Sequence, residues 1–335
     1  MQIHDLNDYY KPRKKPILPI VLGVIVAAIV ICGIVFSFSS EKTPEEQTSN
    51  AEETSADIKT VEQTPPEGLT IKDYETPIVV KEEVAATLTE AEIASAIEQG
   101  DKAVHSAKFE AARNFYLSAY EGLGTTDLKK SKELEDKIGR CSIELFTTPR
   151  PMKGKVDYII NSGDSLSGIA SKYNCPVDLI MKSNNINNAN AIRPGDRLIF
   201  PDHPNFSIRV SKTENTLILF LDGRLFKKYI VGTGQFGKTP VGTFKTGFRQ
   251  KEPAWYPGNG PGIPFGDPKN ILGTRWIPLI ATGDTIRVDS YGIHGTWDDK
   301  TLGQQSSNGC VRMSNKDVEE LSMLIPKNTP VEIVE

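Results

Sequence analysis

An uncharged apolar segment near the start constrains this chain more than any other feature. Residues 17–38, ILPIVLGVIVAAIVICGIVFSF, run for 22 positions without a charged side chain, and a helix needs about 20 apolar residues to cross a bilayer. A cleaved signal peptide would have a shorter apolar region of about 7–15 residues. Residues 1–16 form a basic tail with four Lys or Arg between positions 11 and 15, which favours the cytoplasmic side. We therefore expect a single-pass anchor at 17–38 in the cytoplasmic membrane, with the N-terminus inside and the rest outside.

The next region, residues 39–86, is rich in Glu, Thr, Ser and Pro and has no sustained hydrophobic period. Such a composition cannot bury a core and predicts a disordered acidic linker. The whole chain has 335 residues, enough for two or three modest domains beyond the linker. A net charge of −4 gives no electrostatic reason to expect a nucleic-acid partner.

Helical periodicity begins at residue 87 and continues to 148. Thr89 and Glu92 have the spacing of a capping box. The stretch GDKAVHSAKFEAARNFYLSAYEGL resembles a tetratricopeptide-type hairpin, and a third helix is expected after it. Because at least three such repeats are usually needed for a stable array, we interpret 87–148 as a small helical spacer or as a surface for a protein partner.

Residues 155–202 have a compact strand–helix–helix–strand pattern. The segments GDSL, NN and IRPGDRLIFP within them resemble a LysM module over its whole length. This resemblance implies a small βααβ unit that binds peptidoglycan glycan strands. It also makes Gly163, Asp164 and Ser165, in the first turn, candidate glycan-binding residues.

Residues 206–335 are expected to be mostly β, with one or two short helices. Asp222-Gly223 between the apolar runs TLILFL and RLFKKYIVG is a strong hairpin signal. A Gly/Pro-rich segment over 252–270 is long enough to be a lid or a binding loop. One helix is expected within SNKDVEELSMLI, with Ser314 as its N-cap.

The segment GTGQFGKT, residues 232–239, fits the letters of a phosphate-binding Walker A loop. That motif requires a helix immediately after the loop. Here Pro240 and the strand-like pattern VGTFKTGF follow instead. We therefore expect no nucleotide site and no cofactor.

Cys310, in SSNGCVRMS, is the residue with the most chemical potential. Of the four cysteines, Cys32 lies in the apolar segment, and Cys141 and Cys175 are expected to be buried thiols, although they could also pair. One Cys and one His are too few for a structural zinc site, so no metal is expected. His294, 16 residues upstream, could deprotonate the thiol. From these residues alone, an inert thiol and a nucleophile remain equally open.

The C-terminal region resembles the YkuD-type L,D-transpeptidases. The resemblance rests on IHGT followed by SSNGCVRMSNKDVEEL, on GKTPVGTF and on NILGTRWIPL, and it covers residues 207–335. It implies a YkuD-like β-sandwich catalytic domain over 206–335. One departure from many members is Asn308, where they have His before the Gly-Cys pair.

The resemblance also implies roles for single residues. Cys310 is the nucleophile, His294 the base, and the Gly295 carbonyl orients His294. The Gly309 and Cys310 amides hold the oxyanion, Ser307 and Asn308 shape the turn, and Arg312 engages a substrate carboxylate or braces the loop. Four aromatic residues line the stem-peptide groove or else pack in the core or lid: Tyr291, Trp255, Trp276 and Trp297.

The implied activity is peptidoglycan cross-linking. A thioester forms at the third stem residue with release of D-Ala, and an amine of a neighbouring stem then takes the acyl group to give a 3→3 link. Three alternatives stay open: a non-catalytic LysM wall-binding scaffold, an L,D-carboxypeptidase that uses water, and an enzyme that anchors a protein lysine to the wall.

Overall fold

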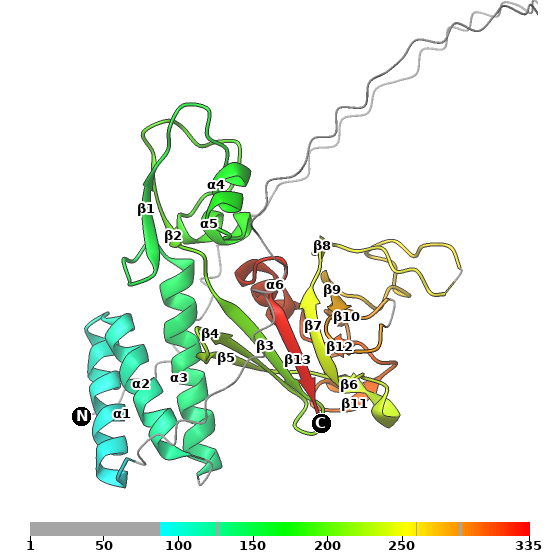
Figure 1. Cartoon of the computed structure of the whole chain (residues 1–335), viewed down its shortest axis with the longest axis horizontal. Helices are drawn as coiled ribbons and strands as arrows, with labels where there is room; N and C mark the ends of the chain where they lie inside the picture. Colours follow the sequence, from blue (N-terminus) through cyan, green and yellow to red (C-terminus); the bar gives the residue numbers. More distant parts are fainter. Residues whose placement is uncertain (1–87, 125–126, 259, 288–289) are drawn as a thin grey trace, which may run out of the picture. The chain divides into compact units, whose positions relative to one another are not determined.

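The computed structural model describes residues 88–335, except for 125–126, 259 and 288–289. The predicted basic tail, membrane span and acidic linker lie outside these residues. Within the described part, no helix combines the length and the apolar character that a membrane crossing requires. Three kinds of structure follow one another along the chain: helices, a small α/β unit and a large sheet (Figure 1).

The first unit contains the expected hairpin and third helix: α1 (Glu90–His105), α2 (Phe109–Leu123) and α3 (Leu128–Thr147). α1 begins with the predicted capping box, in which Thr89 and Glu92 satisfy each other's backbone N–H groups. Asp127 caps α3 by accepting from two backbone N–H groups. Tyr116, Leu117 and Ile138 are almost completely buried between the helices.

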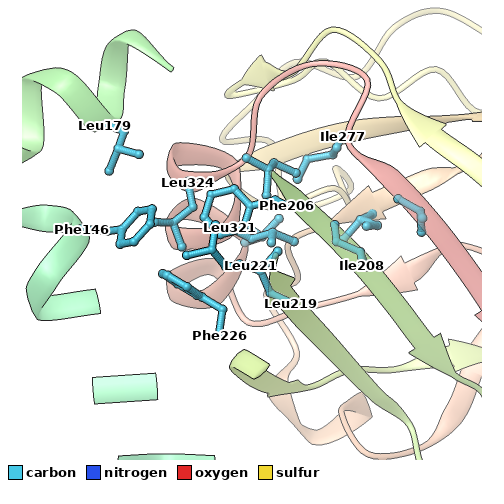
Figure 2. Close-up of a cluster of buried hydrophobic side chains, with 14 of the residues drawn as sticks. Phe146, Leu179, Phe206, Ile208, Leu219, Leu221, Phe226, Ile277, Leu321 and Leu324 are labelled. Carbon is cyan, nitrogen blue, oxygen red and sulfur yellow. The ribbon is translucent and has the colours of Figure 1, made fainter. Parts of the chain in front are cut away.

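The second unit has the expected βααβ order, with β1 (Lys155–Ile159), α4 (Leu166–Lys172), α5 (Val177–Ser183) and β2 (Arg197–Pro201). β1 and β2 pair in antiparallel register. Its buried side chains, among them Leu179 and Phe200, belong to one hydrophobic cluster with the large sheet. In Figure 2, Leu179 of this unit and Phe146 of α3 lie on the same side of the cluster, facing Leu324.

The third region, residues 206–335, contains a nine-stranded mixed sheet in the order β12-β10-β9-β7-β13-β3-β4-β5, with β8 also paired to β9. Its strands are β3 (Phe206–Ser211), β4 (Thr216–Leu221), β5 (Arg224–Ile230), β7 (Gly242–Thr246), β8 (Gln250–Lys251), β9 (Arg275–Ala281), β10 (Gly292–His294), β12 (Val311–Arg312) and β13 (Pro330–Val334). A separate ladder pairs β6 (Thr233–Gly234) with β11 (Gln305–Ser307). The expected two-sheet sandwich is therefore replaced by a single curled sheet, because β9 bridges β7 and β10 and joins the two halves.

Local sequence signals account for two connections in this sheet. Asp222 and Gly223 both have positive φ, as a type I′ hairpin turn between β4 and β5 requires. After the Walker-like segment, β7 follows instead of a helix, and the loop itself holds only the short 3-10 turn η3 (Gln235–Gly237). The expectation that no phosphate-binding helix follows this loop is confirmed.

The helix α6 (Asn315–Leu324) begins at the predicted cap Ser314. Its apolar side chains Leu321 and Leu324 are fully buried and face the sheet residues Phe206 and Ile277 in one core (Figure 2). α6 follows directly after β12, so this packing also anchors the strand that carries Arg312.

Candidate active site

Cys310 lies in the turn between β11 and β12 and is half-buried. Ser307 holds this turn through its hydroxyl, which accepts from the Gly309 N–H at 3.0 Å and donates to the Cys310 carbonyl at 2.7 Å. Gly309 has φ +138°, a conformation that other residues rarely adopt. Asn308, at the tip of the turn, is exposed.

The turn changes one predicted role. The Gly309 N–H already donates to Ser307 and is not free to bind an oxyanion, contrary to the expectation that both amides serve. No hydrogen bond of the Cys310 N–H is found among the described residues. The Cys310 N–H is therefore the amide left to meet a developing negative charge at this turn.

Strand register places His294 next to β12, the strand that follows Cys310. β10 and β12 are parallel, with His294 opposite Arg312. Two residues earlier along both segments, Gly292 therefore lies opposite Cys310. Residues two apart share a face, which brings His294, Arg312 and Cys310 to the same face of the sheet. The Arg312 backbone is fixed from its other side by paired 2.8 Å hydrogen bonds with Gly232.

The Gly295 carbonyl lies 2.6 Å from Nδ1 of His294. Because a carbonyl oxygen can only accept, Nδ1 carries the hydrogen and donates it. In the neutral ring Nε2 is then the unprotonated nitrogen, the one able to take a proton. His294 is 2% exposed, so its ring has little freedom to turn away from this tautomer.

The electrostatics of the site favour uncharged groups at rest. Burial lowers the pKa of His294 to about 4, against the hydrogen bond to Gly295, and the positive charge of Arg312 lowers it further. Burial raises the pKa of the Cys310 thiol, although the Gly292 N–H and Arg312 partly offset this. At neutral pH the pair therefore rests as a thiol and a neutral imidazole.

Trp276 forms a wall beside these groups. It is the β9 partner of His294, and the two rings lie 5.9 Å apart between centroids with an interplanar angle of 34°. A Cβ on Gly292 would come within 2.8 Å of the Trp276 ring and 2.6 Å of the Ile277 carbonyl. The absence of a side chain at Gly292 thus lets the indole of Trp276 lie against Gly292 and beside His294.

The other predicted aromatic residues are placed differently. Tyr291 is 4% exposed and packs against Phe244 at 5.6 Å, so it lies in the core rather than lining an open groove as one interpretation had it. Burial and the nearby Cys310 raise its pKa, and its hydroxyl lies near Thr239 without a well-formed hydrogen bond. Trp297 is half-exposed and pairs with Phe265 of the Gly/Pro-rich segment.

The LysM candidates shape their own turn. Asp164 accepts from the Tyr158 hydroxyl and the Asn161 N–H, Ser165 caps α4, and Gly163 has positive φ. A separate hollow in this unit follows the segment from α5 to β2. It is lined by Asn184, Ile186, Ala191, Ile192, Asp196, Arg197 and Leu198.

Metal chemistry and disulfides find no support in the described residues. Among them, no group of three or more His, Cys, Asp or Glu side chains could hold a metal ion. Cys141 and Cys175 are separate, buried, free thiols, in agreement with the preferred expectation over a Cys141–Cys175 bridge.

Sequence reasoning missed three residues that support the site. Thr239 is fully buried and contacts the turn that carries Cys310. Asn270 clamps the Gly/Pro-rich segment, and Asn315 accepts from the Thr274 N–H at 3.0 Å next to Gly295. All three lie in the segments that carry the family resemblance, GKTPVGTF, NILGTRWIPL and SSNGCVRMSNKDVEEL. The resemblance did not indicate their hydrogen-bond partners, which lie up to 70 residues away.

Comparison with known proteins places this geometry in a family. Residues 205–333 match YkuD, the L,D-transpeptidase catalytic domain, and residues 158–201 match the LysM domain. The protein named "Putative L,D-transpeptidase YkuD" of Bacillus subtilis (strain 168) is 31% identical over 182 residues, which cover 52% of this chain and 97% of that protein. "Putative L,D-transpeptidase YqjB" of the same organism is 39% identical over 127 residues, 38% of this chain and 69% of that protein.

A crystal structure of an L,D-transpeptidase from Mycobacterium tuberculosis H37Rv aligns with 42% of this chain and 62% of its own, with 17% identity and a TM-score of 0.32. The sequence relatives are the informative ones, since YkuD is matched over nearly its whole length. The chain therefore belongs to the YkuD L,D-transpeptidase family of enzymes and carries a LysM peptidoglycan-binding domain beside its catalytic domain.

Proposed function

We propose that the protein is a peptidoglycan L,D-transpeptidase that cross-links stem peptides through a thioester on Cys310. The observation that carries this proposal is the fixed tautomer of His294 on the strand adjacent to the nucleophile, with Nδ1 bound to Gly295 at 2.6 Å. An imidazole held in this way has one defined nitrogen, Nε2, for proton transfer.

In the first half-reaction, the Cys310 sulfur attacks the carbonyl carbon of the third stem residue while its proton passes to Nε2 of His294. The carbonyl oxygen becomes negative, and the Cys310 N–H donates to it. When the tetrahedral intermediate collapses, the bond to D-Ala breaks. His294 gives its proton to the leaving amine, which leaves a thioester and neutral groups.

The second half-reaction reverses these roles. An amine of a neighbouring stem attacks the thioester carbonyl, and Nε2 takes a proton from that amine. The C–S bond breaks, the sulfur regains its proton, and an amide joins the two stems. Arg312, whose guanidinium makes no ion pair within the described part of the chain, is available to bind a substrate carboxylate.

The location of the enzyme forms part of the proposal. The uncharged segment 17–38 after a basic tail supports a single-pass anchor, with the catalytic domain outside the cytoplasmic membrane. The LysM domain would then hold the enzyme on glycan while the linker 39–86 gives it reach. Both domains would find their polymer in the same compartment.

Intact-mass spectrometry tests the chemistry. The purified protein, incubated with a carbapenem or with a tetrapeptide stem, is expected to gain one covalent adduct on Cys310. The variant Cys175→Ala, which removes a buried thiol elsewhere, should keep the adduct, and Cys310→Ala should lose it. A free Cys310 thiol that forms no adduct with either compound would refute the proposal.

Product analysis tests the choice of acceptor. A second stem peptide added to the acyl-enzyme should yield the cross-linked dimer in excess of the hydrolysed tripeptide. Tripeptide as the sole product would instead establish a carboxypeptidase.

A further inference from the structure

A buried hydroxyl links the Walker-like loop to the nucleophile's turn. Thr239 is fully buried, and its Oγ1 donates to the Gly309 carbonyl at 2.6 Å. The same oxygen accepts from the Gly234 N–H at 2.7 Å. Both distances lie at the short end of the range for such bonds. One side chain therefore connects two segments that are 70 residues apart in sequence.

The bond to Gly309 has a geometric consequence for Cys310. The Gly309 carbonyl and the Cys310 N–H belong to the same planar trans peptide unit, so they point in opposite directions. A hydroxyl that holds the carbonyl on one side thereby aims the N–H at the other. This N–H is the amide of the turn that has no partner among the described residues.

The turn needs such an external restraint. Gly309 has φ +138° and no side chain, so its own conformational preference does little to keep the peptide in one orientation. Ser307 fixes the two flanking groups, the Gly309 N–H and the Cys310 carbonyl, but neither belongs to the peptide unit between Gly309 and Cys310. A Cβ on Gly234 would lie 3.0 Å from the Gly309 Cα, which shows how closely the loop supports the turn.

We propose that Thr239 is a positioning residue for the oxyanion site: its hydroxyl orients the peptide between Gly309 and Cys310 so that the Cys310 N–H meets the negative oxygen of the tetrahedral intermediate. The inference rests on the proposed acyl transfer at Cys310. It assigns the Thr-Pro segment a part in catalysis without contact to the substrate.

Two reactions of the Cys310 thiol distinguish a loss of oxyanion stabilisation from a general loss of folded structure or thiol reactivity. Acylation by a carbapenem passes through a tetrahedral intermediate and needs the oxyanion site. Alkylation by iodoacetamide displaces iodide from a saturated carbon, so it needs the thiol and its base but no oxyanion donor. Because an unfolded chain can still be alkylated but cannot be acylated, both rates are compared in samples that circular dichroism shows to be folded.

Thr239→Val keeps the shape of the side chain and removes its hydroxyl. We expect its acylation rate constant to fall by about 10- to 100-fold, somewhat less than the loss of an entire oxyanion donor. The carbapenem concentration that half-saturates the acylation rate should stay within about threefold of the wild-type value, since the binding contacts are retained. The rate constant of iodoacetamide alkylation should also stay within about threefold, since the thiol is retained. Thr239→Ser, which keeps the hydroxyl, should restore the ratio of acylation to alkylation.

Thr246 supplies a matched control. It is also buried, and its hydroxyl donates to the Pro326 carbonyl at 3.3 Å and accepts from the Thr329 N–H at 3.0 Å, away from the turn. Thr246→Val should therefore lose stability without changing the ratio. An unchanged ratio in Thr239→Val, or an equal fall in Thr246→Val, would overturn the inference. A wild-type protein that alkylates but never acylates would instead refute the proposed function itself.

Discussion

Acidification should destabilise the protein in a way that includes a distinct contribution from His294. The pKa of its imidazole is lowered from 6.5 to about 4 in the folded state, chiefly by burial. Between these pH values the unfolded chain binds a proton that the folded chain does not, so stability falls as pH falls. This lowering of the pKa changes the free energy of unfolding by about 3 kcal/mol, since each pKa unit corresponds to about 1.4 kcal/mol. This contribution is fully present above pH 6.5 and lost by about pH 4.

Urea unfolding at several pH values measures this effect in the purified protein. Because carboxylates also titrate in acid, the useful quantity is the free energy of unfolding of the wild type minus that of His294→Gln. This difference should shrink by about 3 kcal/mol between pH 7 and pH 4. The variant His105→Gln, which removes an exposed histidine from α1, reports the effect of losing a histidine away from the site.

The same values predict the pH profile of acylation. Between about pH 4 and the raised pKa of the thiol, Cys310 and His294 together hold a constant number of protons. The rate constant for carbapenem acylation should therefore be flat from about pH 5 to 8 and fall below about pH 4. Two results together would refute the conclusion that His294 is buried and neutral at rest. They are an acylation rate constant that falls with a midpoint near pH 6.5, and a difference in unfolding free energy between wild type and His294→Gln that does not change with pH.

Three further changes have defined outcomes. Asn270→Ala removes bonds to two carbonyls and one N–H from a buried position, so the free energy of unfolding should fall by about 1–3 kcal/mol and proteolysis within 252–274 should accelerate. Phe236→Gly should leave the thermal midpoint unchanged or slightly higher, because the side chain is 90% exposed and φ is +54°; a clear loss of stability would contradict this. Gly292→Ala should lower the free energy of unfolding by about 1–3 kcal/mol through overpacking against the Ile277 carbonyl and the Trp276 ring, and unchanged urea unfolding would contradict this.

Signals confined to short stretches predicted much of this molecule. The capping box at Thr89, the Asp222-Gly223 turn and the cap at Ser314 all form as expected, because each depends on residues within a few positions. The Walker-like segment could be rejected for the same reason, since Pro240 and the residues after it are incompatible with a helix. The prediction that Cys141 and Cys175 are buried thiols is also confirmed.

Features that depend on distant partners escaped prediction. Nothing near Thr239 in the sequence indicates that its hydroxyl meets Gly309, and nothing near Tyr291 indicates that its ring is covered by Phe244. The use of the Gly309 N–H by Ser307 depends on a turn geometry that letters alone do not specify. The curl that joins the sheet through β9 is also a property of long-range pairing.

The helical unit illustrates how such long-range packing changes an interpretation. β5 is the last strand of the sheet order, and an uncovered edge strand exposes backbone groups that promote aggregation. Leu225 of β5 is 4% exposed within the apolar cluster of the helices, and Arg113 donates to its carbonyl and to Ser142. Arg224 forms a bidentate pair with Glu121 at 2.8 and 2.9 Å.

These contacts bury apolar surface and give one backbone carbonyl of β5, that of Leu225, a hydrogen-bond partner, which a tether between two domains has no need to do. A spacer would expose a polar surface on all sides, whereas α2 and α3 direct apolar and charged side chains at β5. The helices therefore pack against β5 and contribute to the stability of the sheet, in addition to packing against one another.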